Sequence, residues 1–148
     1  MTIDIGQITD KQIQSWNTYG YVYSSSHLKK NISQYVHSVE EIESLNKKNR
    51  KSLFYYEEIE GSPKLCRIEK FLEDNKFLKK QILGGDILGY INKLNSNSFY
   101  LYKEKINIKF PGGSGYSAHQ DATAYHKLKG HITCLIALTK MDQENGFL

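Results

Sequence analysis

Residues 103–122 read KEKINIKFPGGSGYSAHQDA, and this stretch decides both the fold class and the candidate site. Its first part, residues 103–110, alternates polar and apolar side chains, which predicts a strand with one face on a core. A glycine-rich loop follows, and then His119-Gln120-Asp121. Residues two apart in an extended chain point to the same face, so we expect the imidazole of His119 and the carboxylate of Asp121 to lie side by side.

This pair matches one edge of a metal site. A facial triad of two histidines and one carboxylate binds non-haem Fe(II) and leaves coordination positions open. A bare His-x-Asp pattern also occurs by chance in many proteins, so the pattern is a weak signal by itself. His126 and His131 follow Asp121 too closely to complete the triad without strain, and we interpret both as ordinary surface or strand histidines.

Outward from this stretch, the chain predicts helices first and strands later. Thr9 and Gln12 form a capping-box pattern that opens a short helix, which Gly20 closes. Apolar spacing predicts further helices over residues 28–45 and 77–94, the second loosened by Gly84-Gly85. Strands are predicted over residues 21–23, 53–59, 64–71, 103–110, 116–121 and 132–138. This order indicates an α+β domain.

The stretch 103–122 closely resembles the signature of the phytanoyl-CoA dioxygenase family, with a strand bearing Lys and Asn, a Pro-Gly-Gly loop and His-Gln-Asp. Residues 132–148 are similar to the family's apolar strand and Asn-Gly-x-Leu turn. Residues 8–22 look like its opening helix and strand, and Leu65-Cys66-Arg67-Ile68-Glu69 also matches many members. The resemblance spans nearly the whole chain.

The resemblance implies a fold. We expect an α+β chain with a mainly β core, in which a double-stranded β-helix (a cupin-like jelly roll) carries N-terminal helices and is incomplete at the C-terminus. The prediction is a single domain over residues 1–148. Residues 1–98 would supply helices and short strands, and residues 99–148 the first jelly-roll strands with the His-x-Asp motif.

The resemblance also implies a chemistry. Family members bind Fe(II), use 2-oxoglutarate as cosubstrate and consume O2, so His119 and Asp121 are expected to be catalytic metal ligands. Asn107 and Thr133 occupy positions where related enzymes contact the cosubstrate. Asp121 argues against a halogenase, which needs a small residue there. The family's distal His and its 2-oxoglutarate Arg lie beyond Leu148, so we expect this chain alone to be inactive.

The predicted reaction is hydroxylation of a small, anionic organic substrate by a 2-oxoglutarate-dependent dioxygenase. Lys103, Lys105 and Arg67 are the candidate substrate-binding residues, because cations at a cavity mouth attract anions. Each supporting residue also has a plainer interpretation. The three cations are then solvated strand charges, Asn107 satisfies a neighbouring strand, and Thr133 is an ordinary β-former.

Two other classes stay open. One is a non-catalytic jelly-roll binding module or a degenerate homologue. The other is a cupin-type metal enzyme of different chemistry, such as an isomerase, that holds the metal without a keto acid. Formation of succinate from 2-oxoglutarate would separate both from a dioxygenase.

Composition bounds the remaining partners. The net charge is +4, and the basic run 47–51 lacks the interleaved aromatics of a nucleic-acid surface, so we expect no nucleic acid. No apolar run approaches the roughly 20 residues of a membrane span, and no signal peptide is apparent. Cys66 and Cys134 are interpreted as buried thiols of a reducing compartment, which favours the cytoplasm. The sequence leaves the oligomeric state open.

Overall fold

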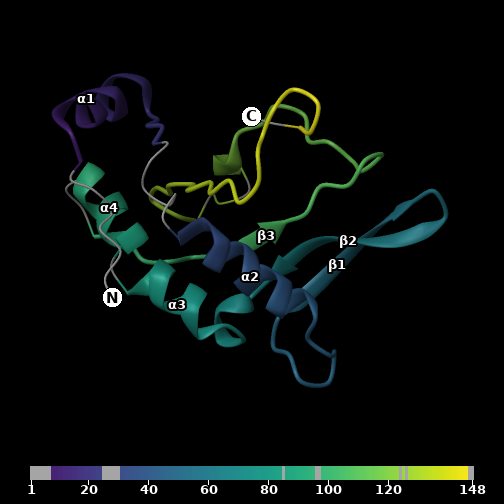
Figure 1. Ribbon diagram of the computed structural model, residues 1–148. Helices are drawn as coiled ribbons and strands as arrows, with labels where there is room; N and C mark the ends of the chain where they lie inside the picture. The colour runs from purple at the N-terminus through teal and green to yellow at the C-terminus, as the bar shows by residue number, and fades with distance from the viewer. Residues whose placement is uncertain are drawn as a thin grey trace. The chain divides into compact units, whose positions relative to one another are not determined.

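The computed structural model describes residues 8–24, 31–84, 86–95, 98–123, 125 and 127–146, and its fold is α+β (Figure 1). In chain order the elements are α1 Asp10–Tyr19, α2 Ile32–Glu43, β1 Leu53–Ile59, β2 Ser62–Glu69, η2 Phe71–Glu73, α3 Lys76–Leu83, α4 Asp86–Asn95, β3 Lys105–Asn107 and η3 Asp121–Thr123. Two compact units result. The helical unit comprises residues 1–53 and 68–106, and the hairpin unit comprises residues 54–67 and 107–148.

Helix α1 begins and ends as its sequence predicts. The side chain of Thr9 accepts a hydrogen bond from the N–H of Gln12 at 3.3 Å, and the side chain of Gln12 accepts from the N–H of Thr9 at 3.0 Å. Gly20 adopts φ +75°, and its N–H donates to the carbonyl of Trp16. The capping box and the left-handed glycine therefore fix both ends of the helix.

The helical unit has an apolar core. Helix α3 packs against α4 and η2, α2 contacts α3, and α1 contacts α4. Ile42 and Ile68 are completely buried, and the ring of Tyr35 meets Phe77 edge-on with centroids 5.2 Å apart. The helix predicted over 77–94 is two helices, because α3 ends at Gly84, where a Cβ would lie 2.3 Å from the carbonyl oxygen of Lys80.

Strands β1 and β2 form a hairpin, and β3 follows them in the order β1-β2-β3 (Figure 1). Glu60 and Gly61 make the turn with φ values of +51° and +72°, the pair of positive angles that a type I′ turn requires. Beyond β3, the N–H of Ile108 still donates to the carbonyl of Cys66 at 2.9 Å. This hairpin is the prediction over 53–71, confirmed with its second strand shifted by about two residues.

Several predicted strands are absent from the described residues. Residues 21–23, 116–121 and 132–138 pair in no ladder, and the strand predicted over 103–110 is reduced to β3. A strand exists only when a neighbour completes its hydrogen bonds, and in the described part of the chain the sheet stops at β3. The alternation itself is real, because Lys105 and Asn107 are exposed while Ile106 is half-buried. The jelly roll stays a prediction.

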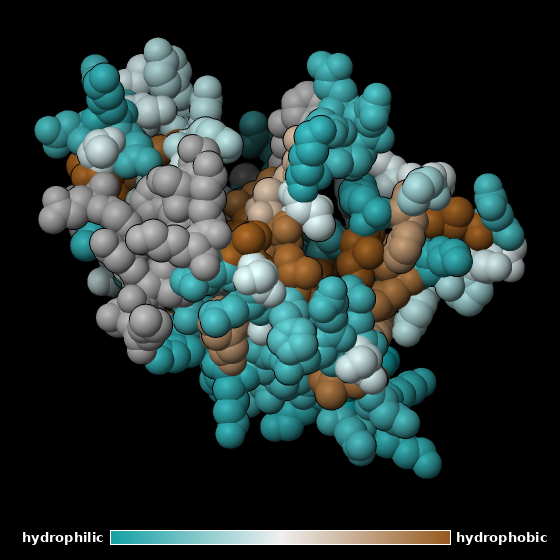
Figure 2. Space-filling model, in the orientation of Figure 1, coloured by the Kyte–Doolittle hydropathy of each residue, from teal (hydrophilic) through white to brown (hydrophobic). Residues whose placement is uncertain are grey.

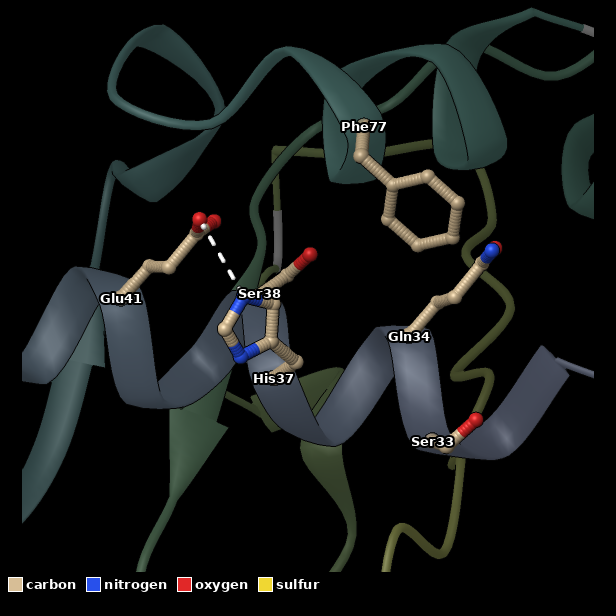
Figure 3. Close-up of a pocket in the computed structure, with 6 residues that line it drawn as sticks. All are labelled: Ser33, Gln34, His37, Ser38, Glu41 and Phe77. Atoms are coloured by element: carbon tan, nitrogen blue, oxygen red, sulfur yellow. Dashed lines mark ion pairs between the residues drawn. The ribbon is translucent and has the colours of Figure 1, made fainter.

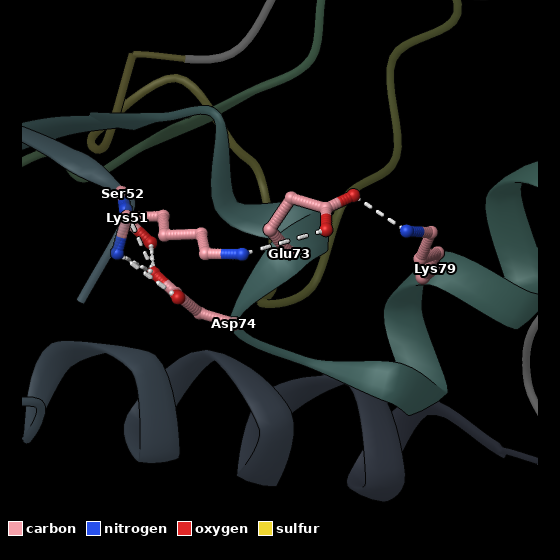
Figure 4. Close-up of polar contacts among 5 residues, drawn as sticks. All are labelled: Lys51, Ser52, Glu73, Asp74 and Lys79. Carbon is pink, nitrogen blue, oxygen red and sulfur yellow. Dashed lines mark hydrogen bonds and ion pairs between the residues drawn. The ribbon is translucent and has the colours of Figure 1, made fainter. Parts of the chain in front are cut away.

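A carboxylate ties the start of β1 to the segment before α3 (Figure 4). Asp74 accepts hydrogen bonds from the backbone N–H groups of Lys51 and Ser52 and from the Ser52 hydroxyl. Partial burial raises the pKa of Asp74, but the bonds from Ser52 and Lys51 outweigh it, and the net pKa is lowered. A hydrogen bond from Lys79 likewise lowers the pKa of Glu73, which also pairs with Lys51.

The surface mixes hydrophobic and hydrophilic residues on the face shown in Figure 2. Leu135 is 56% exposed and Phe110 is 41% exposed. Both cysteines are free thiols. Cys66 is half-buried, and Cys134 has an exposed surface although surrounding atoms that bury its sulfur raise the pKa of the thiol. Among the residues described above, no helix combines the length and the hydropathy needed to cross a membrane.

Candidate metal centre

The loop that leads from β3 to the candidate ligands is held by side chains on both sides. The carboxylate of Glu57, on β1, accepts from the N–H of Ser114 at 3.1 Å, and the ammonium of Lys109 donates to the carbonyl of Ser114 at 3.0 Å. Gly112 has φ +77°, a conformation that favours glycine. A Cβ on Gly113 would lie 2.8 Å from Oε1 of Glu57, so a larger residue there would displace this carboxylate.

His119 and Asp121 bring their ligating atoms together after this loop. Nε2 of His119 lies 3.3 Å from Oδ1 of Asp121. The two side chains are 59% and 41% exposed, so a cation can reach them from solvent. Adjacent ligands of an octahedral metal, each about 2.1 Å from it, lie about 3 Å apart. The pair therefore has nearly the spacing of two ligands on one divalent cation.

A neighbouring group engages the other polar atom of each ligand. Nδ1 of His119 lies 2.8 Å from the carbonyl oxygen of Ser117. A carbonyl oxygen only accepts, so Nδ1 carries a proton, and Nε2 of the neutral ring keeps its lone pair. The hydroxyl of Thr133 donates to Oδ2 of Asp121 at 3.0 Å. Such supporting contacts orient the ligands of metal sites, and here they leave Nε2 and Oδ1 for a cation.

The two ligands come together through a turn and not through the predicted strand. Residues 116–120 are irregular, and η3 begins at Asp121. The hydroxyl of Thr123 donates to the carbonyl of Gln120 at 2.8 Å and closes this turn. The two side chains therefore converge as predicted, but a turn brings them together where a strand was expected. The role of His119 and Asp121 as iron ligands stays a prediction.

The two residues predicted to bind cosubstrate have different surroundings. Thr133 belongs to the candidate centre through its bond to Asp121. Asn107 is the last residue of β3 and is exposed, and the structure records no contact that ties it to His119 or Asp121 among the described residues. The cosubstrate roles stay predictions for both.

The three predicted substrate-binding cations are divided between the units. Lys103 and Lys105 belong to the helical unit, where Lys103 pairs with Glu69 at 2.9 Å and Lys105 is exposed. Because Lys105 is exposed, solvent stabilises its charge. No substrate anion is needed to balance it. Arg67 belongs to the hairpin unit, and its guanidinium donates to the hydroxyl of Tyr116. The substrate roles of all three stay predictions.

Other histidines add no third ligand in the described part of the chain. The ring of His131 meets that of Tyr125 edge-on, with centroids 5.2 Å apart. His126 lies outside the described residues. Within the described residues, no group of three His, Cys, Asp or Glu side chains is placed to hold a metal ion.

Three residues of the centre were not predicted. Ser117 supplies a backbone carbonyl, the ring of Tyr116 neighbours that of His119, and the ammonium of Lys109 lies over the Tyr116 ring. Lys109 and Tyr116 lie in the stretch 103–122, so their proximity to the motif was visible. Their contacts could not be predicted, because side-chain directions follow from the regular repeat of a helix or strand, and this loop has neither.

A hollow of about 340 Å³ lies elsewhere, in the helical unit (Figure 3). It is lined by Ser33, Gln34, His37, Ser38, Glu41 and Phe77. His37 is 71% exposed and lies 3.5 Å from Glu41 of the same helix. An exposed pair one helical turn apart is an ordinary surface ion pair, so this hollow contributes nothing to the candidate centre.

Curated relatives align with nearly the whole chain. The chain is 36% identical over 142 residues to the methylphosphonate hydroxylase of Gimesia maris, and 32% identical over 145 residues to the 2-aminoethylphosphonate dioxygenase of the uncultured bacterium HF130_AEPn_1. Each alignment covers 95% of this chain but 55% of the relative, so the chain spans about half the length of these proteins. A dioxygenase of Epichloe uncinata is 32% identical over 95 residues, which is 64% of this chain and 37% of that protein.

No solved structure matches the chain. The family profile described as phytanoyl-CoA dioxygenase (PhyH) matches residues 16–148, which include the hairpin, the glycine loop and both candidate ligands. The profile and the relatives together extend over nearly the whole sequence. The chain belongs to the phytanoyl-CoA dioxygenase family.

Proposed function

We propose that the protein is a non-haem Fe(II)- and 2-oxoglutarate-dependent hydroxylase and that His119 and Asp121 are two of its metal ligands. The observation that carries this proposal is the 3.3 Å separation between Nε2 of His119 and Oδ1 of Asp121. The contacts from Ser117 and Thr133 to the remaining polar atoms support it. The family and the relatives that are named as hydroxylase and dioxygenase support the reaction class.

The Fe(II) centre would supply the chemistry when it is bound. It would couple oxidative decarboxylation of 2-oxoglutarate by O2 to insertion of one oxygen atom into a C–H bond of the substrate. His119 and Asp121 supply a neutral nitrogen and an anionic oxygen to hold the metal. The carbonyl of Ser117 keeps the ring of His119 in the tautomer that exposes Nε2.

Thr133 orients Asp121 in this proposal. A hydroxyl has one proton, and Thr133 donates it to Oδ2 of Asp121. The same proton is then not available to a carboxylate of 2-oxoglutarate. We therefore assign Thr133 to positioning Asp121, and we keep Asn107 as the residue of this chain proposed to contact 2-oxoglutarate.

The double-stranded β-helix is part of the same proposal. Family membership supports it, because the resemblance noted in the sequence implies that fold. The stretch 132–138 is apolar yet exposes Leu135, as a strand does before another strand or layer covers it. We propose that this stretch is a jelly-roll strand in the complete protein.

For the substrate, we propose a small organophosphonate. Two relatives are named for methylphosphonate and for 2-aminoethylphosphonate, and both align over 95% of this chain. A phosphonate is a compact anion, which agrees with the anionic substrate that the cations of the sequence predict.

Succinate formation by the complete protein tests the proposal. We expect succinate to form from 2-oxoglutarate when Fe(II), O2 and methylphosphonate or 2-aminoethylphosphonate are all supplied. His119→Ala and Asp121→Ala should each abolish this turnover. His37→Asn, which changes an exposed histidine of α2, is the matched control and should retain it. Undiminished succinate formation by Asp121→Ala would contradict the assignment of the ligands.

A further inference from the structure

We propose that Arg67, Lys109 and Tyr116 form a subsite for the dianionic head group of the substrate, beside the metal ligand His119. This inference rests on the proposed function for the substrate class and adds the residues that would recognise it. Of these three, Lys109 and Tyr116 have no ligand-binding role in the proposed function, and the structure groups them with Arg67.

Tyr116 is the common neighbour of the group. The guanidinium of Arg67 donates to its phenol oxygen, and Nζ of Lys109 lies 5.0 Å from the centroid of its ring. The ring of His119 lies on the same tyrosine, with centroids 6.5 Å apart. Two cations and one candidate metal ligand therefore surround a single aromatic ring, and all four residues belong to the hairpin unit.

The hydrogen bond between Arg67 and Tyr116 makes the phenol of Tyr116 a donor toward a ligand. The phenol oxygen accepts from the guanidinium, so the phenol keeps its own proton to donate in another direction. Arginine presents several N–H groups in a planar fork that matches phosphate-like oxygens. The guanidinium carbon also lies 6.0 Å from the ring centroid of Tyr55, which helps to hold its plane.

Lys109 supplies the second positive charge. Its ammonium donates to the carbonyl of Ser114, and among the described residues the structure records no carboxylate paired with it. The nearby carboxylate of Glu57 is engaged by the N–H of Ser114. Lys109 and Arg67 each lie at Tyr116, so two positive charges are available there to attract a dianion.

A small solute can reach this group. Tyr116 is 67% exposed, Lys109 is exposed and Arg67 is half-buried. A head group bound there would leave the rest of the substrate next to His119, because the ring of Tyr116 contacts both. The geometry therefore favours a substrate in which the C–H bond to be oxidised lies within a few bonds of the anionic group, as in a short alkylphosphonate.

Anaerobic calorimetry on the complete protein tests the subsite without turnover. The protein is loaded with Fe(II) and 2-oxoglutarate, and it is titrated with methylphosphonate as a dianion or with methanesulfonate, a monoanion of similar shape. We expect Arg67→Gln and Lys109→Gln each to weaken methylphosphonate binding about tenfold or more, and Tyr116→Phe to weaken it several-fold. Arg67→Lys should bind with intermediate affinity.

The control is Lys127→Gln, which removes one exposed positive charge from the same unit and should bind methylphosphonate as the unmodified protein does. Wild-type affinity for methylphosphonate in Arg67→Gln or Lys109→Gln would overturn the subsite, and so would equal binding of methanesulfonate and methylphosphonate. If Arg67→Gln also loses Fe(II), the subsite is tested with Tyr116→Phe and Arg67→Lys. Unchanged methylphosphonate affinity in both variants then overturns the proposal.

The two proposals fail separately. If succinate forms with a phosphonate while the Arg67 and Lys109 variants bind it normally, the hydroxylase assignment stands and the subsite is wrong. If methylphosphonate binding depends on these residues but no phosphonate supports succinate formation, the subsite stands and the proposed reaction is wrong.

Discussion

The hydroxyl of Thr133 determines which oxygen of Asp121 is left for a cation. It donates to Oδ2 at 3.0 Å, while Oδ1 lies 3.3 Å from Nε2 of His119. Removal of such a supporting contact typically lowers metal affinity about 10- to 100-fold. We expect Thr133→Val, which keeps the shape and loses the hydroxyl, to weaken Fe(II) binding by roughly tenfold in the complete protein.

Anaerobic Fe(II) titration measures this change. Thr133→Ser should restore most of the affinity, because it returns the donor. Thr139→Val, at an exposed threonine nearby in sequence, should have no effect. Equal Fe(II) affinity in Thr133→Val and the unmodified protein would contradict a positioning role.

At this scale the sequence indicated the pair, named Thr133 in a different role and missed Ser117. His119 and Asp121 are separated by one residue, and an extended backbone would point both side chains to one face. The turn at Gln120 brings the same two side chains together instead. The contacts from Ser117 and Thr133 depend on the path of an irregular loop. A backbone carbonyl leaves no mark in the sequence, so Ser117 was beyond prediction.

At the scale of elements, the glycine loop depends on one close approach. A Cβ on Gly113 would lie 2.8 Å from Oε1 of Glu57 and 3.0 Å from the carbonyl oxygen of Phe110. We expect Gly113→Ala to displace the Glu57 carboxylate, to break its bond to Ser114 and to destabilise the protein by about 1 kcal/mol or more. Denaturant unfolding measures the loss.

Gly115→Ala is the matched control for this change. A Cβ at Gly115 meets nothing within 4 Å, and its φ is not positive. The substitution should leave the free energy of unfolding unchanged or slightly raised, since alanine restricts the unfolded chain more than glycine does. Equal effects at the two glycines would show that the Glu57 contact does not shape the loop.

The tie between Asp74 and the start of β1 carries a pH dependence. Its folded pKa is lowered from 3.8, so the bonds stabilise the fold above that pH and are lost as the pH falls through the folded pKa. We expect Asp74→Asn to destabilise the protein by about 1 kcal/mol at neutral pH, because the Ser52 and Lys51 donors lose a charged acceptor.

Urea unfolding at several pH values measures this effect. The difference in the free energy of unfolding between the unmodified protein and Asp74→Asn should begin to shrink below about pH 4, where the carboxyl of the unfolded chain takes up a proton. It should be lost as the pH falls through the lower pKa of the folded state. Asp142→Asn, which removes a carboxylate paired with exposed Lys140, should show a smaller difference at neutral pH. If the difference in the free energy of unfolding stayed constant down to about pH 2, the pH dependence could not be assigned to Asp74.

Local signals predicted the elements unequally. The cap at Thr9, the apolar spacing of α2 and the strand-like composition of residues 53–59 and 64–71 are local signals. The structure confirms the elements that they predict, with the second strand shifted by about two residues. The stretches 116–121 and 132–138 have strand-like composition, but their state depends on a hydrogen-bonded neighbour, which a local pattern cannot reveal.

At the scale of the whole molecule, His119 and Asp121 supply two of the ligands that the proposed metal site needs. Among the described residues, no third His, Cys, Asp or Glu side chain joins His119 and Asp121 in a group that could hold a metal ion. We expect a polypeptide of residues 1–148 alone to bind Fe(II) weakly and to form no succinate from 2-oxoglutarate. Mass spectrometry of reaction mixtures, with the complete protein as the positive control, checks this. Stoichiometric succinate from the short polypeptide would contradict it.

The bond between Glu57 and Ser114 also bears on the order of folding. It joins residues 57 positions apart, and the bond between Arg67 and Tyr116 joins residues 49 apart. The β1-β2 hairpin closes through a two-residue turn, and such local pairings form in microseconds, whereas distant contacts first require closure of a long loop. The loop that carries His119 should therefore acquire its shape after the hairpin. Pulsed hydrogen exchange would then show the amide of Ser114 protected later than those of β1 and β2.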